Sequence, residues 1–117
     1  MPDKTPVSRP ALLGRRALVT GGSRGIGRAV ALALAEAGAD VAITFRARQA
    51  DAVLTCTGIA EHGRRAVSIR ADISQRFEVA ALLASVRTEL GEIDIVVNNA
   101  GVARPAPIDP PTWPRRR

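Results

Sequence analysis

The stretch Arg16-Ala-Leu-Val-Thr-Gly-Gly-Ser-Arg-Gly-Ile-Gly27 decides the fold of this 117-residue chain. Its first five residues, Arg16 to Thr20, predict a first strand with apolar residues at its centre, and a glycine-rich turn follows at once. A helix is predicted from Gly25 to Ala37, and Gly38 then ends it. Its apolar positions repeat at spacings of three and four: Ile26, Val30, Ala33, Leu34 and Ala37. Strand, turn and helix in direct succession predict the start of a βαβ unit.

Three more strands are predicted, over Val41 to Phe45, Ala66 to Arg70 and Ile93 to Asn98. Helices are predicted between them, over Gln49 to His62 and from Ser74, a good N-cap, to Gly91. The buried faces are expected to be Ala52, Cys56, Ile59 and Ala60 in the first of these helices, and Val79, Leu82, Leu83, Val86 and Leu90 in the second. Strands that alternate with helices predict an α/β fold with a parallel sheet.

The predicted fold is therefore half of a doubly wound Rossmann fold, with four parallel strands and three crossover helices. All eight prolines lie in the first ten or the last thirteen residues. Because proline breaks regular elements, we expect one folded domain over residues 11–104, between an irregular extension (1–10) and an irregular tail (105–117).

The composition limits the kinds of functional site that the chain can form. With 46% hydrophobic and 24% charged residues it is typical of a soluble globular protein. It contains no Tyr, one Cys (Cys56), one His (His62) and a single Lys, Lys4, so it offers no disulfide and no Cys/His metal cluster. No apolar run approaches the ~20 residues of a membrane span. We expect a cytoplasmic protein with no membrane partner.

The glycine turn predicts a phosphate site. Glycines let the backbone approach a ligand closely, and the start of the following helix presents N–H groups and partial positive charge to a pyrophosphate. The Lys-Ser/Thr pair of a nucleoside triphosphate loop is absent, because Arg28 and Ala29 follow Gly27. A purely structural turn is the alternative.

Three motifs resemble those of the short-chain dehydrogenase/reductases. Thr20 to Gly27 resembles the family's T-G-x-x-x-G-x-G turn, Asn98-Asn99-Ala100-Gly101 its N-N-A-G motif, and Ala71-Asp72-Ile73 its adenine-contacting element. The turn is most similar to that of the 3-oxoacyl-acyl-carrier-protein reductase group. The resemblance implies an oxidoreductase that moves a hydride between a nicotinamide cofactor and a carbonyl. It implies cofactor contacts at Gly21, Ser23, Arg24, Gly25, Ile26, Gly27, Asp72, Ile73, Asn98, Asn99, Ala100 and Gly101.

Two of these assignments have structural alternatives. Asp72 is also a typical turn or N-cap residue, and Asn98 and Asn99 could tie strand ends together.

The preference between NAD and NADP depends on the end of the second strand, where an acidic residue would hold the ribose of NAD. Arg46 stands there instead and, with Arg24, could clamp a 2′-phosphate, so NADP(H) is preferred over NAD(H). Alternatively, Arg46 and Arg48 simply solvate the start of a helix.

The family's catalytic Ser, Tyr and Lys have no counterparts here, so the resemblance implies that this chain alone is inactive. The Pro- and Arg-rich end suggests a truncated or frameshifted chain that lacks the family's dimer interface. Its fourth strand would leave an open edge, prone to aggregation or partner pairing. Other readings are a non-catalytic NADP-binding or interaction module, a nonfunctional fragment, and a weak nonspecific nucleic-acid binder. The last is disfavoured because three of the six net positive charges are Arg115, Arg116 and Arg117.

Overall fold

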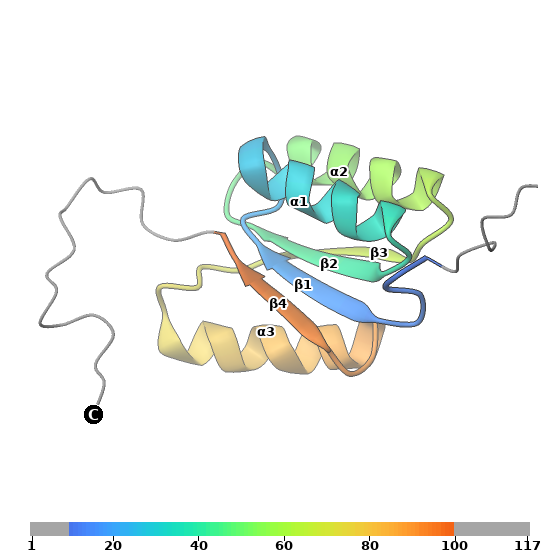
Figure 1. Ribbon diagram of the computed structural model, residues 1–117. Coiled ribbons are helices and arrows are strands. Elements are labelled where there is room, and N and C mark those ends of the chain that lie inside the picture. Colours follow the sequence, from blue (N-terminus) through green and yellow to red (C-terminus); the bar gives the residue numbers. More distant parts are fainter. Residues whose placement is uncertain (1–9, 100–117) are drawn as a thin grey trace, which may run out of the picture.

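The computed structural model describes residues 10–99 and shows an α/β domain in which strands and helices alternate (Figure 1). This confirms the predicted fold class. The elements are β1 (Arg16–Thr20), α1 (Gly25–Glu36), β2 (Asp40–Phe45), α2 (Gln49–Glu61), β3 (Ala66–Arg70), α3 (Arg76–Glu89) and β4 (Ile95–Asn98). Residues 1–9 of the predicted extension (1–10), the end of the predicted domain after residue 99 and the predicted tail over 105–117 lie outside the described residues.

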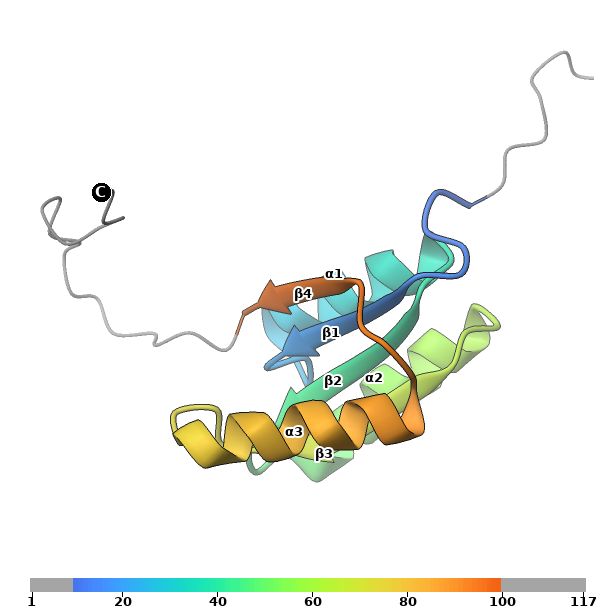
Figure 2. The ribbon, with the colours of Figure 1, turned by 90° about the horizontal axis from the view of Figure 1, so that it is seen from below.

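The four strands are parallel and lie in the order β3-β2-β1-β4. The chain builds the sheet outward from β1 to β3, then crosses back to place β4 on the other side of β1. Helices α1 and α2 cover one face of the sheet and α3 covers the other (Figures 1 and 2). The order of the strands therefore reverses between β1 and β4, and doubly wound proteins bind their ligands at the carboxyl ends of such strands.

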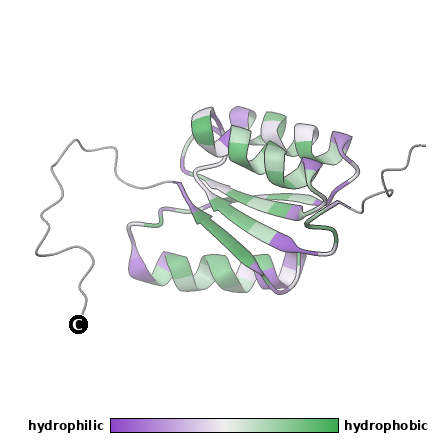
Figure 3. Ribbon diagram, in the orientation of Figure 1, coloured by the Kyte–Doolittle hydropathy of each residue, from purple (hydrophilic) through white to green (hydrophobic). Residues whose placement is uncertain are grey.

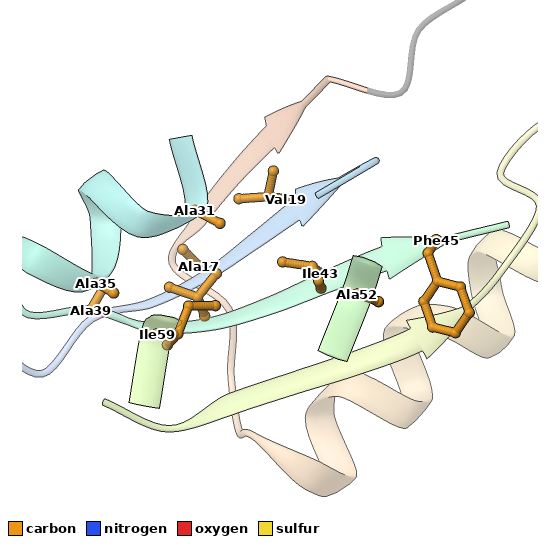
Figure 4. Packing of buried hydrophobic residues seen from close by; sticks show 10 residues of the cluster. Ala17, Val19, Ala31, Ala35, Ala39, Ile43, Phe45, Ala52 and Ile59 are labelled. Atoms are coloured by element: carbon orange, nitrogen blue, oxygen red, sulfur yellow. The ribbon is translucent and has the colours of Figure 1, made fainter. Parts of the chain in front are cut away.

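The larger core lies between the sheet and α1 and α2, where the inward residues of β1 and β2 are fully buried (Figure 4). Small side chains of α1 face it, namely Gly27, Ala31 and Ala35. The predicted apolar face of α1 was therefore wrong in part: Ile26 is 74% exposed, and Val30 and Leu34 only border the core. Helix and sheet can approach closely because small residues lie between them.

Helix α2 differs from its prediction in a similar way. Its fully buried residues are Ala52, Thr55 and Ile59, while Cys56 is half-buried and Ala60 is exposed. Burial raises the pKa of the Cys56 thiol, as expected of a cysteine that serves as a small packing residue. The glycine at position 58, in the middle of α2, lies where α2 packs closely on α1: an added Cβ would lie 2.6 Å from Leu32 Cδ2 of α1.

Among the described elements, α3 covers the second face of the sheet. Leu82, Val86 and Leu90 pack there on Leu18 and Ala42, whereas Leu83 and Phe77 point to solvent at 46% and 77% exposure. The strands are hydrophobic over most of their length and α3 alternates between polar and apolar positions (Figure 3). Ser74 is not the N-cap of this helix, which begins at Arg76, because the Ser74 hydroxyl donates to Asp72 instead.

Candidate functional site

A groove of about 940 Å³ opens at the carboxyl ends of the strands, between the glycine turn, the loops after β2 and β3, and the end of β4. This is the position expected of a ligand site in a doubly wound sheet. Eight of the predicted site residues line it: Gly21, Ser23, Arg24, Arg46, Asp72, Ile73, Asn98 and Asn99. Gly25, Ile26 and Gly27 do not line it, and Ala100 and Gly101 lie outside the described residues.

The glycine turn has a backbone that other residues would not adopt easily. Gly21 and Gly25 have φ values of 70° and 63°. Gly27 is buried directly beneath the turn, where an added Cβ would overlap the carbonyl oxygen of Gly21. Helix α1 then begins at Gly25 without a side-chain cap, which leaves the N–H groups of its first turn available to an anion.

The turn is tied to β2 by Thr44, a residue that the sequence analysis did not single out. The Gly21 N–H donates to Thr44 Oγ1 at 3.0 Å, and the Gly22 N–H donates to the Thr44 carbonyl oxygen at 3.1 Å. Thr44 itself lines the groove and is almost fully buried. The sequence signal that could have identified Thr44 is its polar side chain near the end of a mostly apolar strand.

The end of β4 is tied to the same turn. Thr20 Oγ1 donates to Asn98 Oδ1 at 3.0 Å and accepts the N–H of Asn99 at 3.0 Å. Asn99 Nδ2 donates to the Gly21 carbonyl oxygen at 3.1 Å. Asn98 and Asn99 therefore tie the strand ends together, as their structural alternative predicts. They also line the groove.

Three arginines and one aspartate are the charged side chains that line the groove. Arg46, just after β2, is 3.9 Å from Asp72 Oδ2, and Arg48 is 3.7 Å from Asp51 Oδ2 in the first turn of α2. Arg24 forms no ion pair or side-chain hydrogen bond within residues 10–99. The excess of positive charge makes the groove suited to an anionic ligand.

Asp72 is held in a tight turn after β3. Its carboxylate accepts the Ser74 hydroxyl at 2.6 Å and the Ser74 N–H at 3.0 Å, and its own N–H donates to Glu78 Oε1 at 2.8 Å. These contacts lower the pKa of Asp72, first through the Ser74 hydroxyl, then through the Ser74 N–H, with Arg46 adding a smaller effect. The carboxylate therefore stays ionised and can still accept a hydrogen bond from a ligand.

Residues 10–99 contain neither a candidate metal site nor a candidate membrane-spanning helix. Nowhere in this range do three His, Cys, Asp or Glu side chains come together as a metal site would require. None of the three helices in the range combines the length and apolar character needed to cross a bilayer.

Comparison with known proteins agrees with this geometry. Residues 15–112 match the short chain dehydrogenase family. The chain is 43% identical to the short-chain dehydrogenase/reductase FrzI of Cladobotryum sp over 80% of its own length and 36% of that protein. It is 39% identical to YusS of Bacillus subtilis (strain 168), a short-chain dehydrogenase/reductase homolog, over 84% of its own length and 90% of that protein.

Among solved structures, a short chain dehydrogenase from Burkholderia cenocepacia J2315 in complex with NADP is similar. It is 49% identical, with a TM-score of 0.77, over 80% of this chain and 38% of that one. The chain thus spans little more than a third of FrzI and of the Burkholderia protein, and most of YusS. The glycine turn, the strand order and these matches together show that the chain belongs to the short-chain dehydrogenase/reductase family.

Proposed function

We propose that residues 11–104 form the NADP(H)-binding portion of a short-chain dehydrogenase/reductase. The observation that carries the proposal is the position of Arg46 on the groove, at the end of β2, where a carboxylate would be needed to hold the ribose of NAD. The Burkholderia protein, 49% identical, was solved with NADP bound. Arg46 and Arg24 could both donate to a 2′-phosphate, and charge-assisted hydrogen bonds of this kind are strong.

The groove has the donors and acceptors that the rest of the cofactor requires. Helix α1 begins directly after Arg24, which lines the groove, and its uncapped N–H groups could receive a pyrophosphate. The Asp72 carboxylate on the groove supplies an acceptor for an adenine amino group. Asn98 and Asn99 line the groove at the end of β4, where Asn99 Nδ2 donates to the Gly21 carbonyl oxygen. A bound NADPH would supply a hydride to a carbonyl; this chain's own residues would bind and orient the cofactor.

The proposal for catalysis is that this chain binds the cofactor without turning over substrate. The 117 residues contain no Tyr, and the only Lys is Lys4, so a tyrosine acid with a neighbouring lysine cannot be assembled from them. The turn sequence from Gly22 to Gly27 supports the narrower proposal that this portion resembles that of 3-oxoacyl-acyl-carrier-protein reductases.

Calorimetric titration of the purified chain with NADPH and with NADH tests the proposal. We expect NADPH to bind at least about tenfold more tightly, because only NADPH carries the 2′-phosphate. Adenosine 2′,5′-bisphosphate should displace NADPH, while 5′-AMP at the same concentration should not. A parallel assay of NADPH oxidation with carbonyl compounds should show no turnover. Equal affinity for the two cofactors would contradict the NADP preference, and no binding of either would contradict the proposed function.

A further inference from the structure

A partly buried polar network joins the glycine turn to α1 and α2. Thr55 of α2 is fully buried, and its single hydroxyl hydrogen is shared between the Ser23 carbonyl oxygen at 3.2 Å and the Asp51 carbonyl oxygen at 3.3 Å. Arg28 of α1 donates to the same oxygen through Nη2 at 2.6 Å. A carbonyl oxygen has two lone pairs, so it can accept from both donors at once.

Arg28 also joins the two helices. Its Nε donates to Thr55 Oγ1 at 3.0 Å, and its Nη2 donates to the Asp51 carbonyl oxygen at 3.2 Å. The Asp51 carboxylate lies 3.7 Å from Arg28 and 3.7 Å from Arg48, which lines the groove. The fork of a guanidinium group allows one side chain to make these contacts together, which a lysine could not do.

The network fixes one peptide group of the turn. The peptide between Ser23 and Arg24 is trans, so its N–H points opposite to its C=O. Because Arg28 and Thr55 hold the Ser23 carbonyl toward α2, the N–H of Arg24 is directed away from α2. Ser23 and Arg24 both line the groove, so the direction of this peptide sets part of the surface that a ligand meets.

We propose that Thr55 and Arg28 are positioning residues of the dinucleotide site, which hold the Ser23 carbonyl and so keep the glycine turn in its ligand-receiving conformation. This inference rests on the proposed function, because the ligand is taken to be NADP(H). Neither side chain lines the groove. Their effect on affinity therefore acts through the backbone of the turn.

Helix α2 supplies a matched control two residues away. Thr57 Oγ1 donates to the Val53 carbonyl oxygen at 3.0 Å, the same contact with the preceding helical turn that Thr55 makes to Asp51 at 3.3 Å. Thr57 is exposed and does not reach the glycine turn. Replacing each threonine by valine removes a hydroxyl with little change of shape, and only Thr55→Val removes a donor from the Ser23 carbonyl oxygen.

The experiment measures NADPH affinity and amide hydrogen exchange for the full chain and four variants. Thr55→Val should weaken NADPH binding about tenfold, because a buried hydrogen bond to the turn is lost and Arg28 Nε loses its acceptor. Arg28→Lys should weaken it similarly. Thr55→Ser keeps the hydroxyl and should stay within about twofold of the wild type, as should Thr57→Val.

In the cofactor-free protein, Thr55→Val should speed exchange at the amides of residues 22–27 and leave those of Val41 to Ile43 unchanged. Wild-type affinity in Thr55→Val, equal weakening in Thr57→Val, or a loss of protection that extends equally over β2 would each overturn the proposal. If the wild type bound no NADPH, the proposed function would fail, while the exchange data would still decide whether Thr55 holds the turn.

Discussion

The side-chain amide of Asn99 donates a hydrogen bond to the carbonyl oxygen of Gly21 at 3.1 Å, so the residue after β4 closes directly on the turn after β1. Gly27 lies beneath both of them: a Cβ there would overlap the Gly21 carbonyl and lie 2.6 Å from Asn99 Nδ2. The turn, the first helix and the last strand therefore meet at a point with no room for a side chain.

Gly27→Ala should consequently disturb the groove. The added methyl must displace the Gly21 backbone, which cannot move without breaking its contacts to Thr44 and Asn99. We expect NADPH affinity to fall at least about tenfold and the midpoint of thermal unfolding to drop. Calorimetric titration and thermal unfolding followed by circular dichroism measure the two effects.

Gly58→Ala is the control for that substitution. Its Cβ would meet only the flexible side chain of Leu32, most closely at Cδ2, and α2 gains about 1 kcal/mol of helix propensity. NADPH affinity should be unchanged. If Gly27→Ala bound NADPH like the wild type, the close approach of α1 to the turn would have no role in the site.

Arg46→Asp should shift the preference from NADPH toward NADH. The change removes a cation from the groove and adds an anion beside Asp72, which should repel a 2′-phosphate. We expect the ratio of the NADH and NADPH dissociation constants to move at least about tenfold toward NADH. Arg76→Asp changes the net charge equally on α3, away from the groove lining, and should leave that ratio unchanged. An unaltered ratio in Arg46→Asp would contradict the assignment of Arg46.

Asp72 should contribute a pH-dependent part of the stability. Its pKa is lower in the folded state because the Ser74 hydroxyl, the Ser74 N–H and Arg46 favour the carboxylate. A lowered folded pKa means that this contribution is complete above the unfolded value, about pH 4, and is lost as pH falls through the lower folded value. The difference in unfolding midpoint between wild type and Asp72→Asn should therefore be constant near neutral pH and shrink below about pH 4. A difference that stayed constant down to pH 2 would exclude this effect.

The outer edge of β4 should favour association between molecules. Among the described strands β4 pairs only with β1, and Val96 at its centre is 61% exposed. Val96→Lys should slow aggregation, measured by light scattering, and leave the unfolding midpoint nearly unchanged, because charged residues block edge pairing. Val97→Lys is the matched change on the other face, where Val97 packs on the larger core. It should destabilise the fold by at least about 2 kcal/mol. Equal aggregation of Val96→Lys and wild type would argue against this edge as the contact surface.

Local patterns in the sequence located every element, because strand and helix periods and glycine stops act over a few residues. The predicted limits of β1 and β3 agree with the structure, and those of α2 and β4 differ by one or two residues. β4 begins at Ile95 because Asp94 is engaged with Arg16, its carboxylate accepting the Arg16 N–H at 2.9 Å. That contact joins residues far apart in the chain, so no local pattern could reveal it.

Which face of each helix is buried was harder to predict. The pattern of large apolar residues favoured Ile26 and Leu83, yet both are exposed, and the helices pack through small or polar residues such as Ala31 and Thr55. A hydropathy pattern ranks side chains by size and polarity. Burial depends instead on how closely the neighbouring layer approaches, and in this sheet the approach is close enough to select glycine and alanine.

The sequence by itself determined the order of strands and helices, the glycine turn and the residues that the chain can offer to a cofactor, because these depend on local backbone preference and on composition. Only the tertiary structure decided that Arg46 meets Asp72, that Asn99 reaches Gly21, and that Thr55 and Arg28 hold the Ser23 carbonyl. These contacts join residues brought together by parallel strand pairing and helix packing. Their geometry exists only once the sheet has placed the ends of β1, β2 and β4 side by side.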